Sequence, residues 1–192
     1  MNRTVLILLH GLPATGKTSI GSRIGERLAL PFFSKDFFKE SMHDAMEIGE
    51  VDLDWSRRLG RASIEMTCRI VEQLLAAGVS CIAETCWTPE LAEPFFAKML
   101  ERYRVDLVQI FVWSRPDIRI ERFRERSDND RHPVHADGQR LQGENLYRED
   151  ASEKNRPLNL KGDLIEVDTT DFGTVDLDAI VEQIQRELDQ RN

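Results

Sequence analysis

The stretch Val5-Leu-Ile-Leu-Leu-His-Gly-Leu-Pro-Ala-Thr-Gly-Lys-Thr18 decides the fold. Its first half, Val5 to Leu9, is a continuous apolar run of strand length, typical of a parallel strand buried on both faces. Its second half, Gly11 to Thr18, matches G-x-x-x-x-G-K-[ST] in full, and a helical pattern follows to about Ala29. A strand, a glycine-rich turn and a helix in this order predict a phosphate-binding loop, or P-loop.

This loop also predicts how a nucleotide is held. Glycines let backbone N–H groups point at phosphate oxygens, and the helix that begins here adds its positive end. We expect Lys17 to reach the β- and γ-phosphates and the Thr18 hydroxyl to ligate Mg²⁺. The expected cofactors are therefore ATP and Mg²⁺, and the expected ATP-binding residues are Gly11, Leu12, Pro13, Ala14, Thr15, Gly16, Lys17, Thr18 and Ser19. A glycine turn without a ligand is the alternative.

Strand-like and helix-like segments alternate along the rest of the chain. The predicted strands are 5–9, 30–34, 79–84, 105–113 and 163–169, and the predicted helices are 17–29, 52–77, 89–102, 116–126, a weaker 144–155, and 175–188. Such alternation predicts a parallel sheet with right-handed crossovers. We expect an α/β, three-layer P-loop NTPase fold: a five-stranded parallel sheet with helices on both faces, one domain over 1–192, and a small, polar, mobile lid at about 127–143.

Composition excludes several classes of protein. With 192 residues, 41% hydrophobic residues and a net charge of −8, the chain is suited to a soluble domain rather than to general adhesion to nucleic acid or membranes. Cys68, Cys81 and Cys86 lack the spacing of a disulfide framework or zinc site, which favours reduced thiols and a cytoplasmic location. No apolar run reaches the ~18 residues of a membrane helix, so no membrane partner is expected.

Carboxylates follow three of the predicted strands, where parallel sheets bind their ligands. Asp36, after the second strand, is a candidate base for an attacking hydroxyl, and it is also a candidate N-cap for a helix beginning near Phe37. Glu84 ends the third strand and is a candidate to orient Mg²⁺ through water. Asp168 offers the same pattern at the fifth strand, so the choice between these two stays open.

Four arginines share one face of the predicted helix 116–126. Arg115, Arg119, Arg122 and Arg126 fall at steps of four, three and four. Arg122 and Arg126 are nearer the polar loop, and we expect them to clamp the transferring phosphoryl group. For Arg115 and Arg119, a solvated helix face with local ion pairs to Glu121 and Glu125 is the simpler interpretation.

Other features carry weaker predictions. His132 and His135 have no third metal ligand nearby in sequence, which disfavours zinc and leaves a substrate contact or a surface loop. His10 is expected to pack beside the P-loop, while His43 is uninformative. An apolar stripe on the long helix is expected at Leu59, Ala62, Met66, Ile70 and Leu74. The triplet Asp171-Phe-Gly173 matches a protein-kinase element by chance, since the rest of that set is absent.

The sequence resembles the small P-loop kinases of the adenylate-kinase-like class. The nearest branch is the predicted ATP-dependent kinases grouped with polynucleotide 5′-hydroxyl kinase, chloramphenicol phosphotransferase and gluconate kinase. The resemblance rests on Gly11 to Thr18, Asp36, Arg122 to Arg126 and the loop Arg131 to His135. It implies a five-stranded parallel core, Asp36 as the base and lid arginines on the donor phosphates. Ala14 departs from a frequent glycine, at a free position of the motif.

These features predict an ATP-dependent phosphotransferase that moves the γ-phosphoryl group of Mg-ATP to a hydroxyl of a small molecule. Its expected catalytic residues are Lys17, Asp36, Arg122 and Arg126. One alternative is a nucleic-acid 5′-hydroxyl kinase, with a strand bound by Trp55 and the basic residues Arg57, Arg58, Arg61 and Arg69. A second alternative is an ATP-hydrolysing regulatory switch. The segment 37–69, where the acceptor is expected, takes no part in the resemblance.

Overall fold

The computed structural model describes residues 4–47, 49–129, 131–143, 146–152 and 154–189. Its centre is a sheet of β1 (Val5–His10), β2 (Phe32–Ser34), β3 (Cys81–Glu84), β4 (Asp106–Trp113) and β5 (Asp163–Asp168). The strand order is β2-β3-β1-β4-β5, and all pairs are parallel. The predicted α/β fold with a five-stranded parallel sheet is therefore confirmed.

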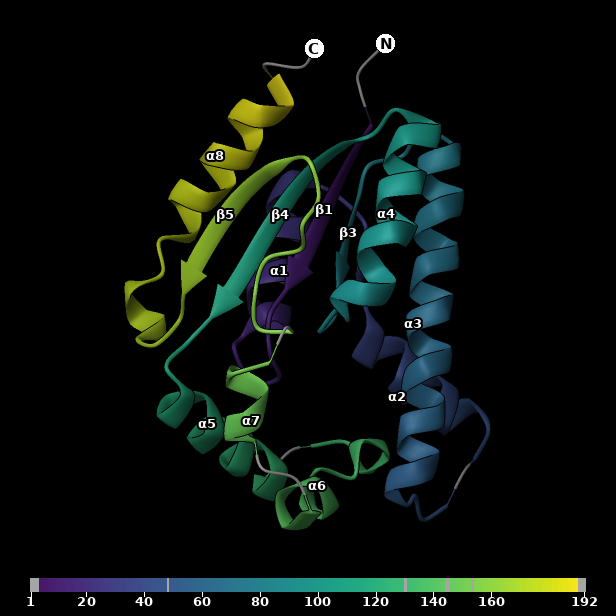
Figure 1. Cartoon of the computed structure of the whole chain (residues 1–192), viewed down its shortest axis with the longest axis vertical. Helices are drawn as coiled ribbons and strands as arrows, with labels where there is room; N and C mark the ends of the chain where they lie inside the picture. Colours follow the sequence, from purple (N-terminus) through teal and green to yellow (C-terminus); the bar gives the residue numbers. More distant parts are fainter. Residues whose placement is uncertain (1–3, 48, 130, 144–145, 153, 190–192) are drawn as a thin grey trace.

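Helices cover both faces of the sheet (Figure 1). Successive side chains of β1 point to opposite faces of the sheet. Val5, Ile7 and Leu9 pack on one face with α1 (Lys17–Leu28) and α8 (Leu177–Asp189). Leu6 and Leu8 point the other way and pack with α3 (Leu53–Ala76) and α4 (Pro89–Tyr103). The apolar run is continuous because both faces of this strand are buried.

The remaining helices lie beyond the carboxyl ends of the strands (Figure 1). They are α2 (Lys35–Ala45), α5 (Pro116–Asn129), α6 (Asp137–Gly143) and α7 (Tyr147–Asp150), with two short 3-10 turns, η1 (Pro133–His135) and η2 (Phe172–Thr174). The segment predicted as a mobile loop is thus largely helical where it is described. Of the predicted helix 144–155, the structure has only α7, and residues 144, 145 and 153 lie outside the described residues.

The buried stripe of α3 differs from the predicted one. Leu59 is buried, but Met66 is 39% exposed, and the buried row is Ser56, Leu59, Gly60, Ser63, Thr67, Val71 and Leu75. The hydroxyls of Ser63 and Thr67 donate to the carbonyls of Leu59 and Ser63, four residues earlier, so they are buried without an unmet hydrogen bond. A prediction that counts only apolar side chains misses such a face. No helix within the described residues has the length and apolar character to cross a bilayer.

Candidate functional site

The P-loop connects β1 to α1 in a backbone shape that few side chains permit. Gly11 has a φ of 146°, and a Cβ there would lie 2.0 Å from the Val112 carbonyl oxygen. Gly16 has a φ of 84°, and a Cβ there would lie 2.5 Å from the Phe172 ring. Ala14 also lies in the left-handed region, with a φ of 67°, which explains why glycine suits this position. The segment Gly11 to Thr18 therefore has the backbone geometry that its glycines predict.

Lys17 and Thr18 begin α1 and face the end of β3. The Lys17 Nζ donates to the Leu12 carbonyl at 2.7 Å and lies 3.9 Å from Glu84 Oε1. The Thr18 hydroxyl donates to Glu84 Oε2 at 3.1 Å. This contact follows from the sheet register, in which Glu84 pairs with Leu9 at the carboxyl end of the neighbouring strand. Asp168 is exposed, and its Oδ1 accepts from the Thr170 N–H. Of the two candidates for orienting Mg²⁺, Glu84 is the one in contact with the P-loop.

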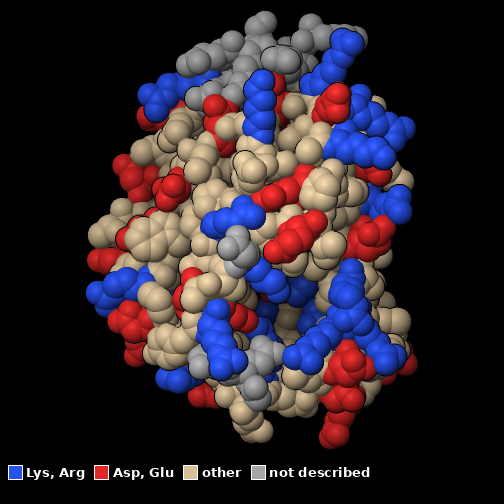
Figure 2. Space-filling model, viewed as in Figure 1, with Lys and Arg blue, Asp and Glu red and all other residues tan. Residues whose placement is uncertain are grey.

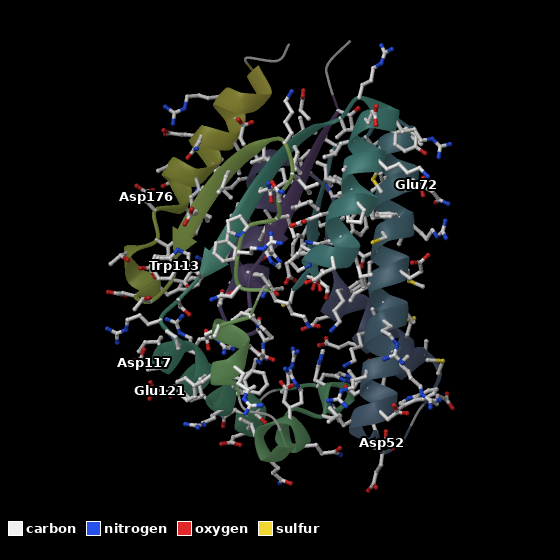
Figure 3. All side chains as sticks on the ribbon, in the orientation of Figure 1. Asp52, Glu72, Trp113, Asp117, Glu121 and Asp176 are labelled. Carbon is white, nitrogen blue, oxygen red and sulfur yellow. The ribbon has the colours of Figure 1, made fainter. Side chains whose placement is uncertain are left out.

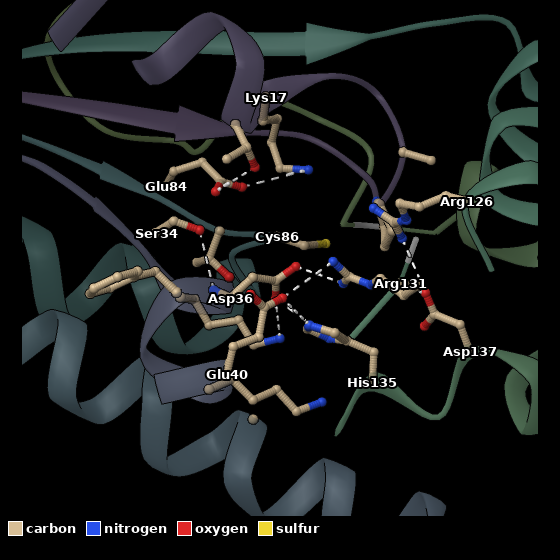
Figure 4. Close-up of a pocket in the computed structure, with 18 of the residues that line it drawn as sticks. Lys17, Ser34, Asp36, Glu40, Glu84, Cys86, Arg126, Arg131, His135 and Asp137 are labelled. Carbon is tan, nitrogen blue, oxygen red and sulfur yellow. Dashed lines mark hydrogen bonds and ion pairs between the residues drawn. The ribbon is translucent and has the colours of Figure 1, made fainter. Parts of the chain in front are cut away.

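Asp36 lies in the first turn of α2, across the cavity from the P-loop (Figure 4). It is not the N-cap, because the cap is Ser34, whose hydroxyl accepts from the Asp36 N–H at 3.2 Å. The Asp36 carboxylate accepts from Lys35 at 2.8 Å and from Arg131 at 2.7 Å. Burial by itself raises the pKa of this carboxyl, but the charges of Lys35 and Arg131 outweigh it and hold the pKa well below its usual range. Asp36 is therefore ionised at neutral pH.

The lid closes over Asp36 through ion pairs and hydrogen bonds that cross from α2. Arg131 pairs with Asp36 and also with Asp137 at 3.2 Å. His135, buried in η1, makes a 2.7 Å hydrogen bond with Glu40 of α2. Burial lowers the pKa of His135 to about 2, so its ring is neutral and donates to the Glu40 carboxylate. The Asp36 and Glu40 contacts join segments 95 residues apart in sequence, and sequence reasoning missed Glu40 because pairing over that separation has no local signal. Asp137 was also missed, although its partners Arg126 and Arg131 are only 11 and 6 residues away.

Arg122 and Arg126 both line the cavity from α5. Arg122 Nη2 donates to the Thr170 carbonyl, and Arg126 Nη2 donates to Asp137 at 3.3 Å. Within the described part of the chain, Arg122 Nη1 and Arg126 Nε are buried and have no hydrogen-bond partner. Both side chains are only partly buried and line the cavity, so their guanidinium groups fit an anionic ligand there.

The prediction of a solvated side chain is wrong for Arg119. It is fully buried, not solvated, and pairs with Asp150 at 2.7 Å and Glu149 at 3.5 Å. Its Nη1 also donates to the Pro13 carbonyl, so it helps to hold the P-loop backbone in place. Its partners come from α7 and the P-loop rather than from its own helix, which is why spacing could not find them. Arg115 is exposed as predicted, but its partner is Asp117.

The histidines fall into two groups. His10 is buried beside the P-loop, as predicted, and its Nδ1 accepts from the Trp87 N–H at 3.0 Å. Burial and the nearby Lys17 lower its pKa to about 4. His43 and His132 both form a hydrogen bond with Asp44 Oδ1, at 3.2 and 3.0 Å. The fold thus brings two possible metal-ligating side chains close to His132, although neither is near it in the sequence. These bonds add a further connection between α2 and the lid.

These residues surround one cavity of about 1100 Å³, which is large enough for a nucleotide and a second small ligand. Figure 4 shows Lys17 and Glu84 on one side, Asp36 across from them, and Arg126 and Arg131 on a third side. Lys39 also lines the cavity, and its Nζ donates to the Ser56 hydroxyl at 2.7 Å. The Lys39 side chain is buried, and this burial lowers its pKa to about 7. The predicted catalytic residues Lys17, Asp36, Arg122 and Arg126 are thus brought together at one cavity.

A family model described as an AAA domain, AAA_33, matches residues 6–149 of the chain. The chain belongs to this AAA-domain family. The match spans the P-loop, α2, α3 and the lid arginines. The curated proteins compared with the chain include no significant match.

Solved structures of this AAA-domain protein's relatives agree with the fold. A protein of Chloroflexus aurantiacus J-10-fl, provisionally assigned as a kinase, is 32% identical with a TM-score of 0.83, and the match covers 100% of both chains. A sugar kinase from Janibacter sp. HTCC2649 is 17% identical with a TM-score of 0.58, covering 97% of this chain and 95% of that one. A shikimate kinase from Bacteroides thetaiotaomicron is 16% identical with a TM-score of 0.50, covering 96% and 98%. The last two show the fold alone, and together the matches confirm the resemblance to small P-loop kinases.

Proposed function

We propose that this AAA-domain protein is an ATP-dependent phosphotransferase that moves the γ-phosphoryl group of Mg-ATP to a hydroxyl group of a small molecule. The observation that carries the proposal is the position of Asp36, an ionised carboxylate in the cavity that the P-loop also lines. The kinase assignment of the 32% identical relative and the fold of the sugar and shikimate kinases support it.

The donor half of the cavity fits a triphosphate and its metal. Backbone N–H groups of the P-loop, the start of α1 and Lys17 supply positive charge to phosphate oxygens. The guanidinium groups of Arg122 and Arg126, which line the same cavity, would bind these oxygens as well. Thr18 and Glu84 offer the hard oxygen ligands that Mg²⁺ prefers. The Thr18 hydroxyl would bind the ion directly, and the Glu84 carboxylate would bind it through water. When bound, Mg²⁺ neutralises phosphate charge during transfer.

On the acceptor side, Asp36 would accept a hydrogen bond from the attacking hydroxyl and orient it toward the γ-phosphate. A carboxylate has about four lone-pair directions, so Lys35 and Arg131 leave room for the hydroxyl. A loose phosphoryl-transfer transition state demands positioning more than a strong base, which suits a carboxylate of low pKa. The lid contacts through Arg131 and His135 would exclude water that otherwise hydrolyses ATP.

The test separates the donor role of Lys17 from the acceptor role of Asp36. Lys17→Ala should weaken Mg-ATP use in any reaction. Asp36→Asn should leave ATP affinity unchanged and lower kcat for acceptor phosphorylation by roughly 10²–10⁴-fold. Both are measured by nucleotide-binding titration and by the rate of phosphorylated product formation.

Two results would count against these assignments. An Asp36→Asn variant that transfers phosphate at the normal rate would remove Asp36 from the reaction. ATP turnover that no acceptor accelerates would favour a hydrolysing switch over a transferase.

A further inference from the structure

The cavity is basic in a protein that is acidic. The whole chain has a net charge of −8, yet Lys and Arg outnumber Asp and Glu two to one among the described residues that line the cavity. The basic ones are Lys17, Lys35, Lys39, Arg57, Arg61, Arg122, Arg126, Arg131, Arg140 and Lys154, and the acidic ones are Asp36, Glu40, Glu84, Asp137 and Glu149. Figure 2 shows basic side chains gathered round the hollow on this face.

Mg-ATP does not balance this excess. The complex carries a net charge of about −2. Even if Lys39 is counted as neutral, the described basic side chains that line the cavity exceed the described acidic ones by four. About two positive charges then remain for a second ligand, and a cavity that excludes water makes their neutralisation favourable.

Two of these basic side chains, Arg57 and Arg61, lie on α3 beside Asp36. Along this helix, Arg58 pairs with Asp54 and Arg69 pairs with Glu65, each with an acid four residues earlier. The residue four before Arg61 is instead Arg57, so these two like charges share one face and repel each other. Both line the cavity, and Arg61 has no hydrogen-bond or ion-pair partner among the residues that the structure describes.

This pair of arginines also lies close to the proposed acceptor hydroxyl. Gly60, between them, is next to Lys35, because a Cβ on Gly60 would lie 3.8 Å from the Lys35 Cε. Lys35 in turn binds Asp36. Phe37, which is 63% exposed, and Ile64 line the same wall and offer apolar contact to a carbon skeleton.

We propose that the acceptor is a small alcohol that carries its own oxyanion, a carboxylate or a phosphate, and that Arg61 together with Arg57 binds this group while Asp36 binds the hydroxyl. The inference rests on the proposed function and names its acceptor class. Arginine suits the role because its planar guanidinium bonds two oxygens at once and stays charged.

A nucleic-acid acceptor fits the same wall less well. A strand needs a basic track that continues beyond the cavity, but the outer arginines Arg58 and Arg69 are already paired with acids of their own helix. The net charge of −8 also repels a long polyanion. A 5′-hydroxyl oligonucleotide therefore serves as one arm of the test.

The test compares matched acceptors with the full chain and Mg-ATP. The carboxylate arm uses D-glycerate and D-gluconate against glycerol and D-sorbitol, and the phosphate arm uses D-ribose 5-phosphate against D-ribose. We expect at least one anionic compound to be phosphorylated, with a kcat/KM at least tenfold above its uncharged parent. Arg61→Ala should then raise the KM for that acceptor by about 10- to 100-fold and leave the KM for ATP unchanged.

Arg58→Ala and Arg69→Ala are the matched controls, because they remove the same charge from the same helix outside the cavity. Equal rates for charged and uncharged partners, an Arg61→Ala effect no larger than the controls, preference for the oligonucleotide, or phosphorylation of no anionic compound would each overturn the inference. A different result would contradict the proposed function itself: a rate of ATP hydrolysis that no acceptor changes, including the uncharged alcohols.

Discussion

Arg115 directly precedes α5 and Arg119 lies in its first turn, and each pairs with a carboxylate, yet their surroundings differ. The Arg119 side chain is fully buried between the P-loop and α7, whereas that of Arg115 is 60% exposed. Arg119→Met should lower the free energy of unfolding by about 3–5 kcal/mol, because it leaves the carboxylates of Asp150 and Glu149 without their buried partner. Urea denaturation measures the loss.

Arg115→Met is the control for this substitution. It removes an exposed pair with Asp117 and should cost about 0.5 kcal/mol or less. Figure 3 shows Asp117 and Glu121 at the outer side of α5, away from the cavity. Similar losses for the two variants would contradict the structural role given to Arg119.

At the scale of elements, the lid depends on Asp137 at the start of α6. This buried carboxylate accepts hydrogen bonds from Arg126 and Arg131, at 3.3 and 3.2 Å. Asp137→Asn should lower kcat for phosphoryl transfer about tenfold, because both guanidinium groups lose a charged partner that orients them. The same variant should exchange amide hydrogens faster over residues 133–137.

The control for the lid is Asp117→Asn, which removes a carboxylate that is 61% exposed on the other side of α5. It should change neither the rate nor the exchange. If Asp137→Asn behaves like this control, the lid does not depend on the arginine–Asp137 contacts.

At the scale of the whole molecule, stability should fall as the pH falls below about 6.5. Burial lowers the pKa of His10 to about 4 and that of His135 to about 2. Below 6.5 the unfolded chain binds protons that these native rings do not, so each proton taken up favours unfolding. For His10 alone, the expected loss between pH 7 and pH 5 is about 2 kcal/mol. The raised pKa of Glu40 acts in the opposite direction over the lower part of this range.

His10→Asn isolates this effect, because the amide oxygen keeps an acceptor for the Trp87 N–H. The variant should lose about 2 kcal/mol less than the unsubstituted protein between pH 7 and pH 5, measured as free energy of unfolding in urea. An unchanged pH dependence would show that His10 is protonated in the native protein.

The five parallel strands and the P-loop were predictable, because buried parallel strands and a glycine loop leave strong local patterns in the sequence. Asp36 and Glu84 were found by their positions after strands, and the sheet register explains why Glu84 meets Thr18. The polar composition of 127–143 predicted a mobile lid but not the short helices and ion pairs that the structure has there. Arg119 was misjudged and Glu40 was missed, since their partners lie far away in sequence. Asp137 was missed although Arg131 and Arg126 are near it in sequence, because the segment was interpreted as a mobile loop.

The most direct test of the central claim is ADP formation by the purified protein with Mg²⁺ and ATP, alone and with pooled small alcohols or 5′-hydroxyl oligonucleotides. We predict slow turnover alone and a marked rise with the small alcohols, accompanied by a phosphorylated product. A rise with oligonucleotides alone would identify a nucleic-acid kinase. A rate that no acceptor changes would contradict phosphoryl transfer and indicate an ATP-hydrolysing switch.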